Sequence, residues 1–110
     1  MTTQDVIDKY YGIKTNTDEQ PLTNTINTSV TQILTNNPSR LAFTIINTGT
    51  NPILILNKNT VSLTNGITLI SGGGNASVDF TKDLSLVTNE WYAIADGGTS
   101  SITMITAQID

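Results

Sequence analysis

Four carboxylates in the C-terminal half are the residues that could most directly do chemistry: Asp79, Asp83, Glu90 and Asp96. A pair of them could bind calcium or act as general acid and general base. Neither the spacing of a calcium-binding loop nor a glycosidase-like pair can be read from the sequence, so the pattern favours solvated turn residues. Cysteine and histidine are both absent, which removes thiolate chemistry, the commonest general base and the commonest metal ligand. We predict no catalytic residue, no metal site and no cofactor, and therefore a protein that is not an enzyme.

The run Gly72-Gly73-Gly74 could be imagined as a phosphate cradle. A phosphate-binding loop needs a helix after it and usually a lysine. Here a β-like segment follows, and Lys82 is distant. The pattern therefore favours a flexible hairpin loop.

Trp91 and Tyr92 could form a platform on which a sugar ring stacks. Adjacent residues of a strand point to opposite faces, so only one of the two can lie in the core. Trp91 alternates with Ala93 and Ala95, which favours a core layer of one large residue among small ones. Tyr92 would then face outward, where it is the best single candidate for an interface residue.

Arg40 is the only charged residue between Glu19 and Lys58. Its guanidinium could cap a loop by donating to backbone carbonyls. It could instead bind a carboxylate of a neighbouring subunit with both arms of its fork. The sequence leaves both readings open.

The composition excludes several classes of protein. Charged residues make up 13% of the 110-residue chain and the net charge is −4, against about 25% charged residues in an average soluble domain. Without a cluster of Lys or Arg, the chain is not expected to bind nucleic acid or an anionic membrane surface. No apolar run approaches the roughly 20 residues that span a bilayer, and no signal peptide is recognised at the N-terminus.

From Ser29 onward, short alternating segments are separated by turn residues, with no amphipathic helix among them. This pattern predicts an all-β fold, a single β-sandwich of jelly-roll or Ig-like type with seven or eight short antiparallel strands. In 76–80, Ala76, Val78 and Phe80 are expected to face inward. A change of phase in the last strand predicts a β-bulge near Met104. The predicted strands are 30–35, 41–46, 53–56, 61–63, 67–70, 76–80, 90–96 and 102–109, with a weaker strand or loop at 84–88.

Two turn signals stand out among these strands. The segment 47–52 contains Gly49 and Pro52 and predicts a β-hairpin between 41–46 and 53–56. Asn65-Gly66 is the strongest two-residue turn signal in the chain. Because 53–56 is apolar on both sides, we expect a central strand or one covered by the N-terminal arm or a partner.

The N-terminal residues differ from the rest of the chain in composition and in hydrophobic pattern. Residues 1–12 have helix-like content, with a short helix of about two turns that ends at Gly12. Residues 14–27 are polar and contain Pro21, which indicates an extended arm outside the core or a disordered terminus. We divide the chain into an N-terminal arm, 1–28, and a β-sandwich domain, 29–110.

Several motifs resemble those of small β-sandwich proteins of tailed bacteriophage virions. They are the N-P-x-R start at 37–40, the I-N-T-G-x-N-P-I segment at 46–53 and the Y-A-I-A-x-x-G-T segment at 92–99, which here reads Tyr92-Ala93-Ile94-Ala95-Asp96-Gly97-Gly98-Thr99. The similarity covers about residues 36–105 and leaves the arm outside it. In that group such motifs recur in head decoration proteins and other small structural proteins.

The resemblance implies a non-enzymatic virion protein, a capsid decoration or cement protein that bridges neighbouring capsid subunits. Its partners would be the major capsid protein or other virion subunits, and a homo-oligomer, taken as a trimer, is expected. The alternatives are a receptor- or carbohydrate-binding module of a head or tail fibre, with its site at Tyr92 or at 72–75, and a bacterial surface adhesin domain. The candidate interface residues are Val6, Ile7, Tyr10, Tyr11, Leu22, Ile26, Arg40, Leu54, Leu56 and Tyr92.

Overall fold

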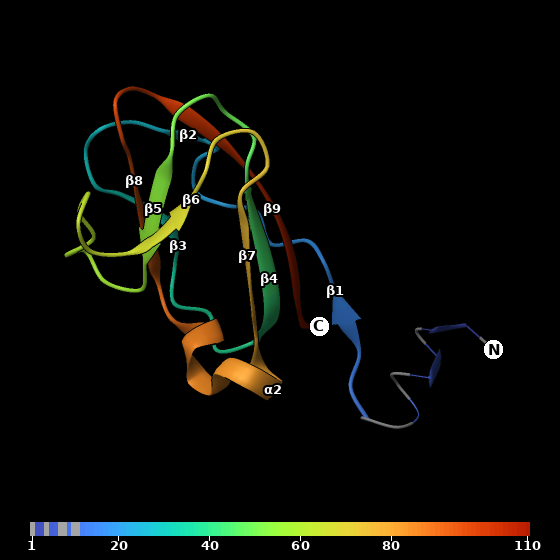
Figure 1. The fold of residues 1–110 in the computed structure, drawn as a ribbon. Coiled ribbons are helices and arrows are strands. Elements are labelled where there is room, and N and C mark those ends of the chain that lie inside the picture. Colours follow the sequence, from blue (N-terminus) through green and yellow to red (C-terminus); the bar gives the residue numbers. More distant parts are fainter. Residues whose placement is uncertain (1, 4, 7–8, 10–11) are drawn as a thin grey trace.

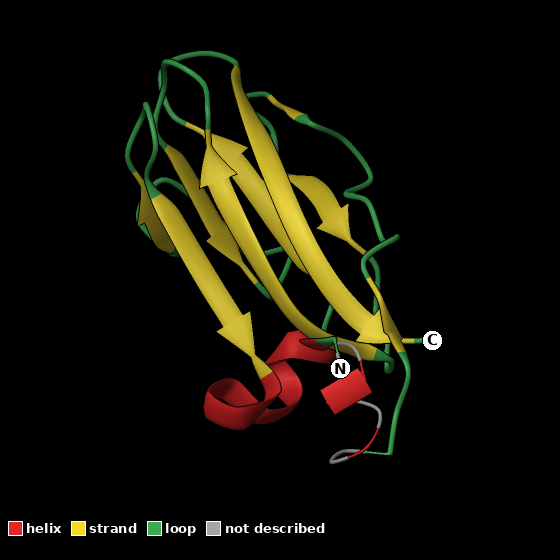
Figure 2. Ribbon diagram, turned by 90° about the vertical axis from the view of Figure 1, so that its right-hand side faces the viewer, coloured by secondary structure: helices red, strands yellow, loops and turns green. Residues whose placement is uncertain are grey.

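The computed structural model describes residues 2–3, 5–6, 9 and 12–110, which form a two-layer β-sandwich (Figure 1). Both layers are antiparallel sheets, so the predicted all-β sandwich is confirmed. The first sheet has the strand order β1-β9-β4-β7, and β2 pairs with another part of β9 (Figure 2). Its strands are β1 (Thr15–Asn16), β2 (Thr25–Ile26), β4 (Arg40–Asn47), β7 (Asn75–Asp79) and β9 (Ser100–Ile109).

The second sheet has the order β3-β8-β5-β6. β5 lies between two partners in this sheet, and its bounds match the predicted strand 53–56. The four strands are β3 (Thr31–Leu34), β5 (Ile53–Leu56), β6 (Ile67–Leu69) and β8 (Trp91–Ala95).

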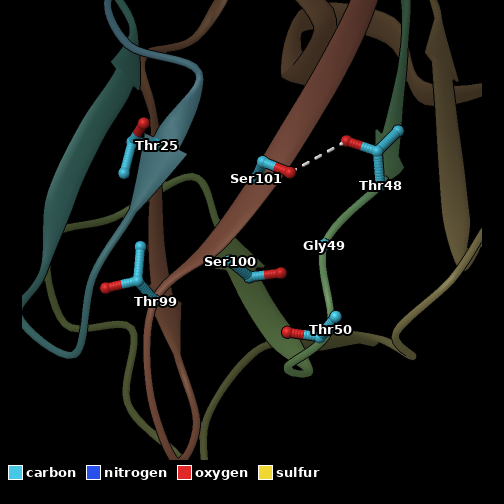
Figure 3. Close-up of a pocket in the computed structure, with 7 residues that line it drawn as sticks. All are labelled: Thr25, Thr48, Gly49, Thr50, Thr99, Ser100 and Ser101. Atoms are coloured by element: carbon cyan, nitrogen blue, oxygen red, sulfur yellow. Dashed lines mark hydrogen bonds between the residues drawn. The ribbon is translucent and has the colours of Figure 1, made fainter.

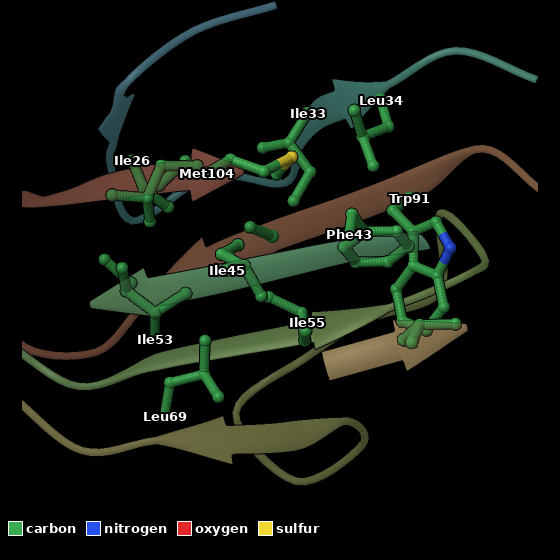
Figure 4. Packing of buried hydrophobic residues seen from close by; sticks show 14 of the residues in the cluster. Ile26, Ile33, Leu34, Phe43, Ile45, Ile53, Ile55, Leu69, Trp91 and Met104 are labelled. Carbon is green, nitrogen blue, oxygen red and sulfur yellow. The ribbon is translucent and has the colours of Figure 1, made fainter. Parts of the chain in front are cut away.

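The predicted hairpin between 41–46 and 53–56 is wrong, because β4 and β5 belong to different sheets. The connection is an arch, in which the side chains of the two strands face each other and their backbones do not bond. Turn-forming residues in 47–52 permit either geometry, and the arch buries an apolar face of both strands. The inward residues are all buried: Phe43 and Ile45 on β4, Ile53 and Ile55 on β5 (Figure 4).

Asn47 holds this arch from inside and is fully buried. Its Nδ2 donates to the carbonyl oxygens of Asn51 (2.8 Å) and Leu69 (3.0 Å). Its Oδ1 accepts from the backbone N–H of Gly49 (3.1 Å) and from Ser100 Oγ (2.8 Å). One amide side chain therefore joins the arch to both sheets.

The glycine-rich loop at 72–74 also crosses between the sheets, from β6 to β7, and is not the predicted hairpin loop. The backbone N–H of Gly72 donates to Gly49 O (3.1 Å), and that of Gly73 donates to Asn47 O (2.8 Å). The two crossing connections therefore bond to each other at one end of the sandwich.

Trp91 lies in the core, as predicted. Trp91, Ala93 and Ala95 are buried, whereas Tyr92 is partly exposed. The Trp91 ring meets the Phe43 ring edge-on, with centroids 5.4 Å apart and an interplanar angle of 72°. This geometry is favourable for aromatic pairs.

The side chains of β9 alternate between the core and the outward side without a break over most of the strand, so the bulge predicted near Met104 is wrong. The register shift instead lies between Arg40 and Ala42 of β4, which pair with Gln108 and Ala107. The alternation leaves Ile105 61% exposed on the outward side. The inward residues of β9 are Ser100, Ile102, Met104 and Thr106.

The segment after β7 is helical and not a strand or loop. α2 (Phe80–Asp83) is followed by the 3-10 helix η1 (Leu84–Thr88). Asp79 caps α2: its carboxylate accepts from Thr81 Oγ1 (2.6 Å) and from the Lys82 backbone N–H (2.9 Å), and these bonds lower its pKa. Because β7 ends at Asp79, Phe80 does not face inward as predicted and is 46% exposed.

The connection from β5 to β6 covers the outer side of β5. Leu54 and Val61 are both buried here, and a Cβ on Gly66 would lie 3.1 Å from Val61 Cγ2 and 3.3 Å from Leu54 Cβ. The predicted strand 61–63 is reduced to a single bridge between Ser62 and Asn65. The tight turn therefore centres on residues 63–64 and not on Asn65-Gly66.

Residues 14–28, assigned from sequence to an arm outside the core, form β1 and β2 on the first sheet. Ile26 is fully buried in the core, and the backbone N–H of Leu22 donates to Ile33 O (2.9 Å). The helix predicted over 1–12 falls partly outside the described residues. Among the described residues, no helix is long and apolar enough to span a membrane.

Candidate functional site

Arg40 is buried at the start of β4, and all of its side-chain N–H groups are engaged. Nε and Nη2 donate to the two carboxylate oxygens of Glu19, each at 2.7 Å. Nη1 donates to the carbonyls of Val87 (3.0 Å) and Asn89 (2.9 Å), and Nη2 also donates to Thr35 O (2.7 Å). Both readings from the sequence hold in part: Arg40 caps loops, and it forks onto a carboxylate, but that carboxylate belongs to its own chain.

Glu19 is the partner that the sequence did not reveal. Asn37 Nδ2 donates to Glu19 Oε2 (3.1 Å) and to Gln108 Oε1 (2.8 Å), which connects the pair to β9. Burial raises the pKa of Glu19, but hydrogen bonds from Arg40 and Asn37 and the charge of Arg40 outweigh it, so the pKa lies below its usual value. Glu19 therefore stays ionised at neutral pH and fastens residues 14–28 to the sandwich.

Acid should release this fastening. Because the pKa of Glu19 is lower in the folded than in the unfolded chain, its contribution is fully present above the usual value of 4.5 and is lost as the pH falls through the folded pKa. Glu19→Gln should lower the free energy of unfolding at pH 7 and flatten its decline between about pH 5 and 3. Urea unfolding at a series of pH values measures the free energy of unfolding of the variant and of the parent. Asp18→Asn, which removes the neighbouring exposed carboxylate, is the control, and equal acid sensitivity of Glu19→Gln and the parent would contradict the prediction.

The candidate interface residues fall into distinct groups. Ile26, Arg40 and Leu54 are buried in the chain's own fold, so they do not present a surface to a partner. Leu56 and Tyr92 are partly exposed side by side on the second sheet, while Leu22 is 57% and Val6 38% exposed. Ile7, Tyr10 and Tyr11 lie outside the described residues.

Tyr92 has a polar neighbourhood on the outer side of the second sheet. Partial burial and the Glu90 carboxylate raise the pKa of its phenol. Gln32 lies directly opposite Tyr92 on β3, and its Nε2 donates to Leu34 O (3.2 Å). This arrangement offers hydrogen bonds but no pair of groups suited to proton transfer.

Of the four carboxylates of the C-terminal half, Asp79 and Asp83 lie beside each other. Asp79 and Asp83 cap the start of α2, with the Asp79 backbone N–H donating to Asp83 Oδ2 (3.0 Å). In the described part of the chain, no group of three or more acidic, His or Cys side chains could hold a metal ion.

A hydroxyl-lined depression, not anticipated from the sequence, lies beside the arch (Figure 3). Its volume is about 400 Å³. Ser100 Oγ is already bonded to Asn47, and the hydroxyls of Thr48 and Ser101 share a bond of 3.1 Å. No lining residue is an acid or a base, so the depression can form hydrogen bonds but cannot activate a nucleophile. It is lined by Thr25, Thr48, Gly49, Thr50, Thr99, Ser100 and Ser101.

Large apolar side chains are exposed at three places on the molecule. The outer face is the outward side of β4 and β9. It has a shallow groove of about 190 Å³, which is bordered by Thr17, Ala42, Thr44, Ile105 and Ala107. The tip consists of Phe80, Leu84 and Leu86 on α2 and η1, at the end of the sheet seen in Figure 2. The β6 edge consists of Leu63, Ile67 and Ile70.

Leu84 is unusual for two reasons at once. It is the most exposed large apolar residue among those described, at 72%, and it has φ +54° and ψ −129°. A non-glycine residue in such a conformation costs about 1–3 kcal/mol. The fold therefore displays an apolar side chain on a strained backbone.

No protein-family model matches the chain, and no curated protein or solved structure matches it. The resemblance to virion proteins consequently stays a prediction. The residues that carry that resemblance have structural roles here: Asn37 and Arg40 hold the Glu19 cluster, and Asn47 and Gly49 form the arch.

Proposed function

We propose that this chain is a non-enzymatic structural protein of a tailed-phage virion, a capsid decoration or cement protein that bridges neighbouring capsid subunits. The observation that carries the proposal is that large apolar side chains are exposed at three separate places on one small sandwich: the outer face, the tip and the β6 edge. Extended exposed apolar patches on soluble proteins mark interaction sites. A bridging protein needs contacts on more than one side, whereas an enzyme needs one concave site with convergent polar groups.

The charge distribution supports the same role. The outward positions of β4 and β9 from Ala42 to Ile46 and from Thr103 to Ala107 hold only alanine, threonine and isoleucine. Charged residues are depleted from the centres of protein interfaces. The β4–β9 part of this face carries no charge, although Asp79 of β7 lies opposite Ala42 at its edge, and it therefore suits close contact with another protein.

The tip is the surface that we propose contacts the capsid. Leu84 projects from it, and the strain at its backbone is kept although glycine would adopt the same conformation without cost. Strained residues that persist in a fold cluster at functional positions. Leu84, with Phe80 and Leu86, would insert into an apolar depression of the capsid surface.

Leu84→Gly separates binding from stability. It should raise the free energy of unfolding by about 1 kcal/mol, because the strain is relieved, although the added flexibility of the unfolded chain offsets part of the gain. It should weaken binding to particles stripped of the protein by roughly tenfold or more, since a buried leucine contributes about 1.5–3 kcal/mol. Co-sedimentation with particles and thermal unfolding measure the two effects.

Asn59→Gly is the matched control, because it removes an exposed polar side chain on the β5–β6 connection. It should leave particle binding unchanged. Undiminished binding by a folded Leu84→Gly variant would overturn the assignment of the tip.

A further inference from the structure

Asn65 and Gly66 form the only Asn-Gly pair in the chain. Asparagine is one of the chemically labile residues of proteins. It is most labile before glycine, because glycine has no side chain to hinder attack by its own backbone nitrogen on the asparagine amide. Both residues are exposed, on the connection between β5 and β6. The pair therefore has the composition and the access to water of a deamidation site.

The fold itself requires the glycine of this pair. Gly66 has φ +154°, a conformation that residues with a side chain rarely adopt. A Cβ at this position would lie 2.9 Å from the carbonyl oxygen of Ile55, a backbone atom of β5. The labile pair is therefore built into the connection, because a larger residue at position 66 would strain the backbone and collide with β5.

The hydrogen bonds around Asn65 leave the reacting atoms accessible. The backbone N–H of Asn65 donates to Ser62 O (3.1 Å), and the Ser62 N–H donates to Asn65 O (3.0 Å). The Asn65 side chain makes one bond, from Nδ2 to Thr60 O (3.2 Å). Gly66 lies just outside β6, and within the described residues its N–H donates to no acceptor. The bond that Asn65 O accepts also draws electrons from the 65–66 peptide group, which makes the Gly66 N–H more acidic.

We propose that Asn65 deamidates spontaneously through a cyclic imide. The Gly66 nitrogen, having lost its proton to water, bonds to Cγ of Asn65, and the side-chain nitrogen leaves as ammonia. Water then opens the ring at either of its carbonyls and gives aspartate or isoaspartate. Overall, one amide and one water become one carboxylic acid and one ammonia, so no oxidant or reductant is needed. This inference does not depend on the virion role, because isolated protein suffices to test it.

The reaction changes the β6 edge. Both products place a negative charge two residues before Ile67, which is 46% exposed. Isoaspartate also inserts the former side-chain methylene into the backbone, next to the bridge between Ser62 and Asn65. The isoaspartate form should therefore unfold at a lower temperature than Asn65→Asp, which supplies the pure aspartate form.

The test is incubation of the folded full chain at mildly alkaline pH, followed by peptide mapping with mass spectrometry. Asn65 should gain the mass of an amide-to-acid change several times faster than Asn75, and both aspartate and isoaspartate should form. Asn75 is the matched control, because it is also exposed and its Nδ2 also donates to one backbone carbonyl, that of Gly73 (3.1 Å), but it precedes Ala76. Asn65→Gln, whose longer side chain closes the corresponding ring far more slowly, should remove the mass change.

Three results would each overturn the inference. They are an Asn65 that stays intact as long as Asn75, a product of aspartate alone, or reaction at Asn65 only after the chain is unfolded in urea. Aspartate alone would indicate direct hydrolysis without the cyclic imide, and reaction in urea alone would mean that the fold protects the pair. Thermal unfolding of the starting sample establishes that the incubated chain is folded.

Discussion

Arg40→Ala should lower the free energy of unfolding by about 3–5 kcal/mol. The substitution leaves Glu19 partly buried without its cation, and it leaves the carbonyls of Thr35, Val87 and Asn89 without their donor. Breaking a buried ion pair by removing one partner costs about this much. Since domains of this size are stable by only about 5–15 kcal/mol, the variant should be largely unfolded in moderate urea. Equilibrium urea unfolding followed by Trp91 fluorescence measures the loss.

Two further variants define what Arg40 contributes. Arg40→Lys keeps the charge but not the fork, so it should recover only a part of the lost stability. Glu19→Gln combined with Arg40→Ala should cost less than the sum of the single changes, because the two side chains act as one unit. A loss below about 1 kcal/mol for Arg40→Ala would show that the cluster does not hold residues 14–28 on the sandwich.

Asn47→Ala should lower the free energy of unfolding by about 3 kcal/mol. It removes four hydrogen bonds at a fully buried position and leaves two carbonyls, one backbone N–H and the Ser100 hydroxyl without partners. Each unsatisfied buried group costs about 1–3 kcal/mol, although water and relaxation reduce the sum. Chemical denaturation compares the variant with the parent.

Asn51→Ala is the control for this change. Its Nδ2 makes one bond, to Thr99 O (2.9 Å), at a more exposed place in the same arch. We expect a loss of about 1 kcal/mol. Equal losses for the two asparagines would contradict the role of Asn47 as the link between the sheets.

The strands themselves could be predicted because their burial pattern is local. The alternation of Trp91, Ala93 and Ala95 gave a correct core layer, and 53–56 was placed with its observed bounds. Which strands pair with each other could not be predicted in the same way, because pairing joins segments that are distant in the sequence. A turn-rich segment such as 47–52 is compatible with a hairpin and with an arch, and the choice depends on which sheet buries each apolar face.

The candidate surfaces were harder to predict, for similar reasons. Glu19 lies 21 residues before Arg40 in a polar segment, and nothing in the sequence connects them. The helical turn that exposes Phe80 and Leu84 had one available signal, the Asp79 cap, which the strand pattern of 76–80 concealed. The hydroxyl-lined depression brings together residues 48–50 and 99–101, which meet only in the folded chain.

The fold also changes the meaning of the motifs that resemble virion proteins. Because Asn37, Arg40 and Asn47 hold the chain's own segments together, the likeness rests on residues that build this sandwich. We propose that the surfaces that bind partners lie elsewhere, at the exposed residues Ile105 and Leu84. Variants at those two residues therefore test function while leaving the framework intact.

The most direct test of the proposed role is electron cryo-microscopy of intact phage particles from a lysate of the strain that encodes the chain. We predict copies of the sandwich on the outer surface of the head, each contacting more than one capsid subunit, with the tip residues Phe80, Leu84 and Leu86 against the shell. Particles that lack the chain, or that carry it only at the end of a fibre, would contradict the account.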